Sequence, residues 1–120
     1  MAEHRKDQRH SKRLRAVIIL DENGKQSKTP GKTQDISSSG ASIISEYNLA
    51  SKHPITVCLL LHPGDEVIPP TVFEAKSKIV STVLSRQQGG FRIGVEFVNI
   101  AGDGAKVLQK LLSASLATTG

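Results

Sequence analysis

The sequence predicts a small antiparallel β-barrel that ends in a single α-helix. Short segments rich in β-branched and apolar residues recur along the chain at regular spacing. Turn-forming pairs separate these segments, as at Asn23-Gly24, Pro63-Gly64 and Gly89-Gly90. Apolar residues at helical spacing follow only at the end, from Asp103 to Leu116. Short, regularly spaced strands followed by one helix are typical of a small barrel.

The first half of the chain should contribute three strands. We expect them at Arg15–Leu20, Lys32–Ser37 and Ala41–Glu46. Asn23-Gly24 is a strong turn signal after the first strand, and Pro30-Gly31 marks a break before the second. Ser38-Ser39-Gly40 is expected to form a turn or bulge before the third strand.

The second half should contribute three more strands and the helix. Ile55–Leu61 is an unbroken apolar run, which predicts a strand buried on both faces, with Cys58 as a small core residue. Val72–Leu84 loses its alternation near its end, so a long strand with a bend or bulge is expected there. Phe91–Val98 alternates cleanly, and Asp103–Leu116 should cover one opening of the barrel or pack on its side.

Composition places the chain among small folded domains. Its 120 residues are 38% hydrophobic, enough for one modest core. No apolar run approaches the roughly 20 residues of a membrane-spanning helix, so no membrane insertion is expected. The charged N-terminus does not read as a secretory signal, and a single cysteine excludes an internal disulfide. A cytoplasmic location is predicted.

The basic charge is concentrated at the N-terminus. Residues 1–15 hold six of the 16 Lys and Arg residues but only two of the 11 acids, so the remainder is near neutral. Residues 1–13 lack apolar periodicity and are predicted to be a flexible basic arm, whereas residues 14–120 should form the barrel and helix. A nucleic-acid binder more often spreads basic residues over a face of its fold. We therefore expect no nucleic acid polymer as a partner, and either a clamp for a small anion or a solvated tail.

Two short motifs carry the functional prediction. Arg9 and Arg13 form R-x-x-x-R, and guanidinium groups donate in a fixed fork that fits a phosphate or a guanine edge. Asp35, Ser37 and Gly40 form D-x-S-x-x-G, which combines an acceptor, a hydroxyl and a residue that lets a ligand approach the backbone. Together they could hold an anionic guanine nucleotide.

The order and spacing of these motifs resemble the PilZ domain family of bacterial cyclic di-GMP receptors. That family carries R-x-x-x-R in a mobile N-terminal segment and [DN]-x-S-x-x-G on the barrel that follows. Here 21 residues, Leu14 to Gln34, separate the motifs, and Phe91–Asn99 looks like the last barrel strand before the closing helix. The resemblance implies a single-domain, six-stranded barrel that binds cyclic di-GMP. The implied ligand-binding residues are Arg9, Arg13, Asp35, Ser37 and Gly40.

The resemblance also implies a mechanism, in which the ligand orders the arm and creates a surface for a downstream partner protein. Simpler explanations remain for each part. The two arginines could be a solvated tail, and Asp35, Ser37 and Gly40 are common turn formers. Gly94 marks a barrel bend or a close approach. The chain has no Trp, so stacking on guanine would fall to arginines.

Two alternative functions are a PilZ-fold adaptor that acts by protein contacts alone and a small-barrel nucleic-acid binder. The near-neutral body and the shortage of exposed aromatics disfavour the second. No nucleophile elbow, P-loop or dinucleotide fingerprint is present, so no catalytic residue and no enzyme activity are expected. The four histidines do not fall at metal-ligand spacing, so neither a metal nor a cofactor beyond the ligand is predicted.

Overall fold

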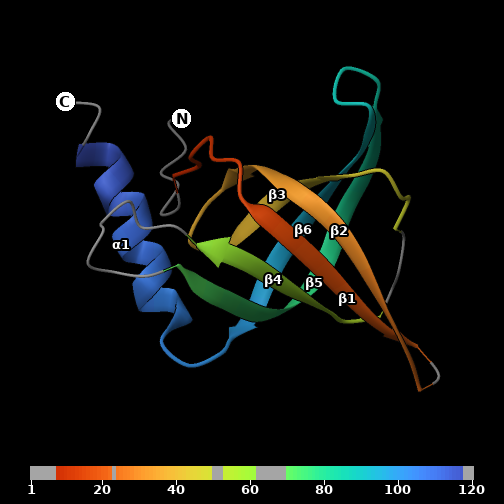
Figure 1. Cartoon of the computed structure of the whole chain (residues 1–120), viewed down its shortest axis with the longest axis horizontal. Helices are drawn as coiled ribbons and strands as arrows, with labels where there is room; N and C mark the ends of the chain where they lie inside the picture. The colour runs from red at the N-terminus through yellow and green to blue at the C-terminus, as the bar shows by residue number, and fades with distance from the viewer. Residues whose placement is uncertain (1–7, 23, 50–52, 62–69, 118–120) are drawn as a thin grey trace, which may run out of the picture.

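The computed structural model describes residues 8–22, 24–49, 53–61 and 70–117, with helix side chains followed to residue 113. Within these residues it confirms a six-stranded antiparallel barrel and one C-terminal helix (Figure 1). The elements are β1 (Arg15–Glu22), β2 (Lys25–Ile36), β3 (Gly40–Ser45), β4 (Ile55–Leu61), β5 (Thr71–Ser85), β6 (Gly90–Ile100) and α1 (Gly104–Ala117). The strands pair in the order β1-β2-β3-β6-β5-β4, and β4 closes the barrel on β1.

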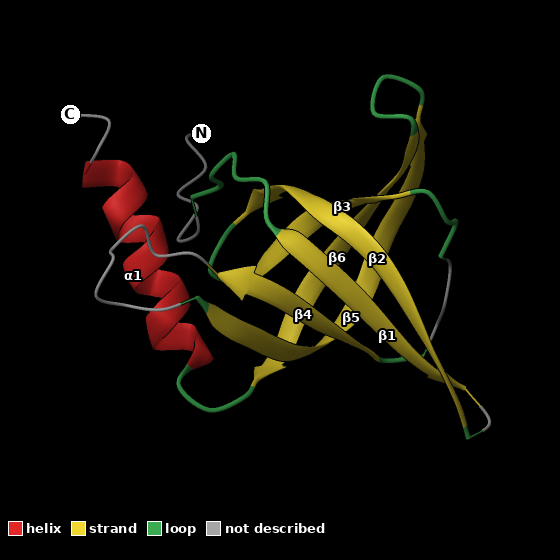
Figure 2. Ribbon diagram, viewed as in Figure 1, coloured by secondary structure: helices red, strands yellow, loops and turns green. Residues whose placement is uncertain are grey.

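Alternating apolar side chains fill the barrel interior. On β6, Ile93 and Phe97 are buried, as the period of two predicts. The rings of Phe73 and Phe97 lie 5.0 Å apart. α1 lies across one end of the barrel (Figure 2), where Leu108 and Leu111 are buried in the same core. Each fully buried leucine contributes about 2 kcal/mol, so the helix closes that end through its apolar face.

β2 is longer than predicted, and the expected break at Pro30-Gly31 is wrong. The strand begins at Lys25 and pairs with β1 as far as Lys32. The β2–β3 pairing starts only at Lys32, so β2 is an edge on that side beside Pro30. Proline is tolerated at such an edge because its missing N–H breaks no ladder hydrogen bond. Ser45 Oγ donates to the Pro30 carbonyl at 3.2 Å.

β4 has the predicted bounds, but the prediction that both its faces are buried is wrong. Its burial alternates strictly, with the odd-numbered residues from Ile55 to Leu61 inside the barrel. Thr56, Cys58 and Leu60 point to the outer face and are half-buried. Cys58 is therefore not a core residue. The apolar run arises because the outer face of this strand is itself largely apolar.

The prediction of a long, bulged strand before the last hairpin is confirmed in β5. The β5–β6 pairing shifts register between Lys76 and Ser77 and again between Ile79 and Ser81. The second shift lies opposite Gly94, where a Cβ atom would lie 2.5 Å from Ser81 Oγ. Gly94 thus accompanies an irregularity of the barrel wall and keeps the outer surface shallow at that point.

Candidate functional site

A bulge in β2 presents Asp35 on the outer surface of the barrel. Thr33 pairs with Ile43 and Asp35 pairs with Ser42, so one extra residue lies between them on β2. Thr33 and Ile36 are both buried, at 1% and 0% exposure, which a strictly alternating strand could not achieve. The bulge absorbs the extra residue and turns the Asp35 side chain outward, to 26% exposure.

Residues 10–14 lie antiparallel beside the end of β2. His10 N donates to Ile36 O at 2.8 Å, and Ile36 N donates to His10 O at 2.9 Å. Thr33 Oγ1 accepts from Leu14 N at 2.8 Å and donates to Lys12 O at 2.5 Å. These bonds attach the end of the predicted arm at two points. Residues 1–7 lie outside the described residues, and the flexibility of the arm stays a prediction.

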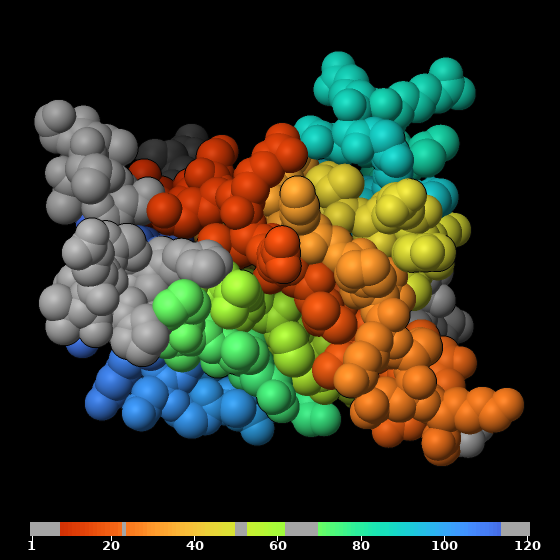
Figure 3. All heavy atoms as spheres, viewed as in Figure 1, coloured from red at the N-terminus to blue at the C-terminus, as the bar shows by residue number. Residues whose placement is uncertain are grey.

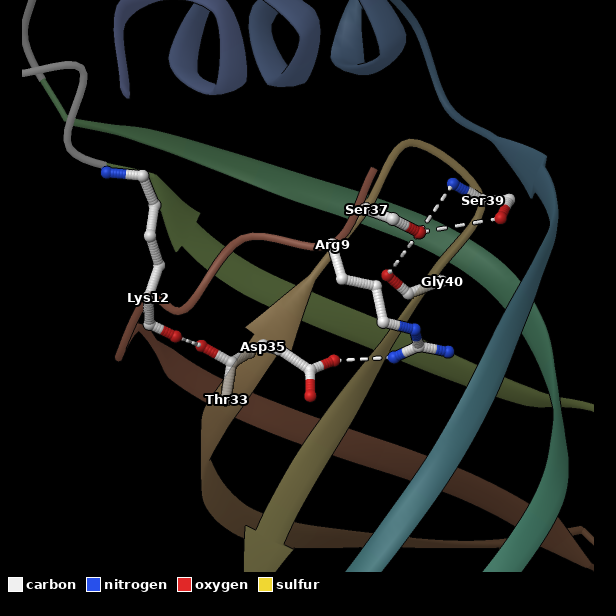
Figure 4. Close-up of polar contacts among 7 residues, drawn as sticks. All are labelled: Arg9, Lys12, Thr33, Asp35, Ser37, Ser39 and Gly40. Carbon is white, nitrogen blue, oxygen red and sulfur yellow. Dashed lines mark hydrogen bonds and ion pairs between the residues drawn. The ribbon is translucent and has the colours of Figure 1, made fainter. Parts of the chain in front are cut away.

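This attachment brings the two motifs into contact. Arg9 Nη1 donates to Asp35 Oδ1 at 2.5 Å, as Figure 4 shows. The Arg9 side chain is 50% exposed. An ion pair this open contributes at most about 1 kcal/mol, so an anion can compete for the guanidinium. Because that group carries five N–H donors in a fixed fork, Arg9 can hold Asp35 and still donate to a second acceptor.

Ser37 lies in the turn between β2 and β3, and Gly40 begins β3 at the end of that turn, beside Arg9 and Asp35. Ser37 is only 3% exposed, and its Oγ accepts from Ser39 N at 3.3 Å and contacts the Gly40 carbonyl at 3.4 Å. Ser37 N donates to Gly40 O at 2.8 Å. A Cβ atom at Gly40 would lie 2.3 Å from the Val95 carbonyl oxygen. Both residues therefore have a structural role in this turn.

Arg13, in the segment before β1, lies apart from the second motif, at the edge of a cavity of about 330 Å³. This volume falls at the lower end of the range for small-ligand sites. The cavity is lined by Arg13, Pro30, Gly31, Lys32, Ile44, Ser45, Glu46 and Gln88. Hence Arg9 meets the second motif directly, whereas Arg13 lies beside Lys32 at the neighbouring cavity.

Strand pairing connects Asp35 to a shallow strip of the outer surface. Asp35 pairs with Ser42 on β3, Ser42 with Gly94 on β6, and Gly94 with Ser81 on β5. We call Ser42, Gly94 and Ser81 the shallow row. The side chains of this row are small on three adjacent strands, so the backbone lies close to the surface there, and Val80 of β5 borders the row, with its Cγ2 3.4 Å from the Cβ position of Gly94.

Arg92 borders the shallow row on the side of the Arg13 cavity. It pairs with Ile44, and Ile44 pairs with Lys32, so all three belong to the next row of the outer face. Sequence reasoning did not single out Ser42 or Arg92, which strand pairing makes candidate site residues. The alternation of β6 places Arg92 on the same face as Gly94, but which strand lies beside β6 is not written in the local sequence.

Metal-ligand clusters and membrane-spanning helices were the other two features to look for in the described residues. In the part of the chain that the structure describes, no three His, Cys, Asp or Glu side chains gather as metal ligands would. Among the same residues, no helix combines the length and the apolar character needed to span a membrane.

Comparisons with known proteins agree with this architecture. Residues 3–114 match the family model described as PilZ domain. No curated protein matches the sequence. Among solved structures, the Inhibitor of motility (MotI/DgrA) of Bacillus subtilis superposes with a TM-score of 0.72 at 18% sequence identity. The superposition covers 97% of this chain and 53% of that one, so the chain spans about half the length of that protein. At this identity the likeness establishes the fold.

Proposed function

The chain belongs to the PilZ domain family, and from that premise we propose that it is a cytoplasmic receptor for cyclic di-GMP that acts on a partner protein. PilZ domains are ligand-binding or adaptor domains. The observation that carries the proposal is the contact between Arg9 and Asp35. It supports a single site made from both motifs, because residues 26 positions apart meet at one point of the surface.

The side chains around this point suit the chemistry of a guanine dinucleotide. Guanine offers N–H donors and the acceptors O6 and N7 on its edges. Asp35 would accept from the N–H groups, while Arg9 and Arg13 would donate to phosphate oxygens or to O6 and N7. The shallow row would let a base lie flat, and the guanidinium of Arg92 could stack on it.

Ser37 and Gly40 are proposed to support the site through the turn that they shape. The Ser37 hydroxyl is buried against the turn backbone, and Gly40 permits the close approach to β6. Direct contacts of these two residues with the ligand stay predictions. Asp35 and Arg9 differ from them because both side chains are partly exposed.

The same contacts suggest how binding would reach a partner. The described end of the arm is held by the His10 and Thr33 bonds and by one exposed ion pair. We propose that cyclic di-GMP, by binding Arg9 and Arg13 together, fastens residues 8–13 across the outer face of the barrel. A segment that becomes fixed on binding changes the surface offered to another protein.

Calorimetric titration of cyclic di-GMP tests this function. The wild-type chain should bind at micromolar or tighter affinity, and Arg9→Ala/Arg13→Ala should weaken binding at least about tenfold, about 1.4 kcal/mol. Asp35→Ala should also weaken binding while the thermal melt stays close to wild type, because this side chain is not part of the core.

The matched control is Lys106→Ala/Lys110→Ala, which removes the same charge from two exposed positions of α1. It should bind like wild type if the arginines act by position and not by net charge. Equal loss in both double variants would show a diffuse charge effect. No binding by the folded wild-type chain would refute the receptor function and favour the adaptor alternative.

A further inference from the structure

The outer face of β1 and β4 is apolar where a small barrel usually presents polar residues to water. Val17 and Ile19 on β1 point outward, as do Cys58 and Leu60 on β4. Pairing places Val17 opposite Cys58, and it places Leu60 opposite Val72 of β5, which is 64% exposed. Figure 3 looks onto this side of the molecule, where β1, β4 and β5 form adjoining parts of the surface.

Basic side chains surround this apolar centre. Ile19 pairs with Lys28 on β2, while Arg15 pairs with Lys32 on the same strand. On the other side, Thr56 of β4 pairs with Lys76 of β5. We call the apolar centre and its rim the β1–β4 face: the centre is Val17, Ile19, Cys58, Leu60 and Val72, and the basic rim is Arg15, Lys28, Lys32 and Lys76.

Two acids interrupt the rim. Glu74 pairs with Cys58, and Asp21 lies two residues beyond Ile19 on the outer face of β1; both are exposed. The pKa of the Cys58 thiol is raised by burial first and by Glu74 second, and Lys28 lowers it. Cys58 pairs with Val17 on one side and with Glu74 on the other, which places it near the centre of the face. The face has four basic groups against these two acids, so its net charge is positive.

We propose that the β1–β4 face is the docking surface for an acidic amphipathic helix of a partner protein. An interface core depleted of charge inside a charged rim is the usual anatomy of a specific protein contact. The face follows the curved barrel wall over β2, β1, β4 and β5, with about 4.8 Å between neighbouring strands, so a helix would lie on the apolar centre on β1 and β4 with β2 and β5 at its two sides. A helix with its side chains is about 10–12 Å across. Leucine-like residues would cover Val17 and Cys58, and flanking Glu or Asp would meet the lysines on both sides.

Other occupants fit these observations less well. A second copy docking through the same face would oppose lysine to lysine across the symmetry axis, which is destabilising. Membrane surfaces are usually entered by protruding aromatic or leucine side chains, whereas this face has no aromatic residue and most of its apolar groups are half-buried. Single-stranded nucleic acid also binds through aromatic stacking.

The docking surface shares only Lys32 with the proposed ligand site, since Lys32 also lines the Arg13 cavity, and the peptide tests do not alter that residue. The shallow row lies on β3, β6 and β5, and β1 and β4 lie across the closed barrel from β3 and β6. Failure of cyclic di-GMP binding would therefore leave this inference standing, and it can be tested without nucleotide.

Cys58 provides the readout, because it is the chain's one cysteine and lies at the centre of the face. The probe is a synthetic amphipathic helix of about 18 residues, long enough to form in isolation, with Leu on one side and Glu beside it. At a concentration about ten times its Kd, it should slow alkylation of Cys58 by N-ethylmaleimide about tenfold. NMR shift changes should be confined to β1, β4 and the paired part of β5.

Charge reversal provides the control. Lys28→Glu/Lys76→Glu should weaken the acidic peptide about tenfold and should create binding to the same peptide made with Lys in place of Glu. Lys106→Glu/Lys110→Glu makes the same charge change on α1 and should leave the acidic peptide's affinity unchanged.

Three results would overturn the proposal: no protection of Cys58 by the acidic peptide, equal weakening by both charge reversals, or NMR shifts on another surface. Protection of Cys58 by phosphatidylserine vesicles or by an oligothymidylate, without protection by the peptide, would assign the face to a membrane or to nucleic acid instead.

Discussion

Gly40→Ala and Gly94→Ala should have different effects. The first should destabilise the fold, and the second should weaken ligand binding. A methyl group at Gly40 would lie 2.3 Å from the Val95 carbonyl oxygen, about 0.7 Å inside the 3.0 Å limit that Cβ atoms respect. At Gly94 the methyl would lie 2.5 Å from Ser81 Oγ. The first obstacle is backbone, which can yield only if β3 and β6 part, whereas the second is a side chain that can rotate.

The magnitude of the Gly40→Ala effect follows from what the separation would disturb. Gly40 pairs with Glu96, and next to it Phe97 N donates to Ser39 O at 2.8 Å. Forcing a methyl into such a contact costs about 1–3 kcal/mol. For a domain of this size that loss lowers the melting temperature by roughly 4–12 °C. Gly94→Ala should lower it by less, because rotation of Ser81 relieves the contact.

Binding should respond differently from stability. The methyl group of Gly94→Ala would occupy space in the shallow row. This variant should therefore bind cyclic di-GMP about tenfold or more weakly while the chain stays folded. Gly40→Ala should bind at low temperature, where most of the chain is folded, because its methyl points at β6. Differential scanning fluorimetry and calorimetric titration at 10 °C supply the two measurements. A Gly40→Ala chain that melts with wild type, or a Gly94→Ala chain that binds like wild type, would refute this division of roles.

Two further predictions concern the arm attachment and the thiol. Thr33→Val keeps the side-chain volume but leaves Leu14 N and Lys12 O without their partner. The free energy of unfolding should fall by about 1–3 kcal/mol, and hydrogen exchange should accelerate at His10 and Leu14. Unchanged exchange there would show that Thr33 does not hold the arm. Because Glu74 raises the pKa of the Cys58 thiol and Lys28 lowers it, Glu74→Gln should increase the thiolate fraction and speed alkylation at pH about 8. Lys28→Gln should slow alkylation, and rates that change in the opposite order would contradict this assignment of charges.

Local sequence patterns were sufficient to predict the barrel class, the residues that point inward on β6, the helix and the two motifs. These features are local, because alternation with a period of two and the turn at Gly24 are set by neighbours along the chain. The same local patterns predicted six strands, the number that the family resemblance also implied. Local patterns gave a wrong strand break at Pro30-Gly31, because they do not show which strands lie beside β2. Pro30 continues the strand since β3 pairs with β2 only from Lys32 onward, so β2 is an edge on that side.

The positions of the surface residues relative to one another follow from the closed barrel and not from local sequence. The β2 bulge turns Asp35 outward because Thr33 and Ile36 both have to be buried once the barrel closes. Closure also fixes which strands are neighbours, and so it sets Ser42 beside Gly94 on one side of the barrel and Cys58 beside Val17 on the other. An apolar run such as Ile55–Leu61 has the same local pattern whether its outer face is covered or open. Whether another element packs over that face depends on the arrangement of distant parts of the chain, which is a non-local property.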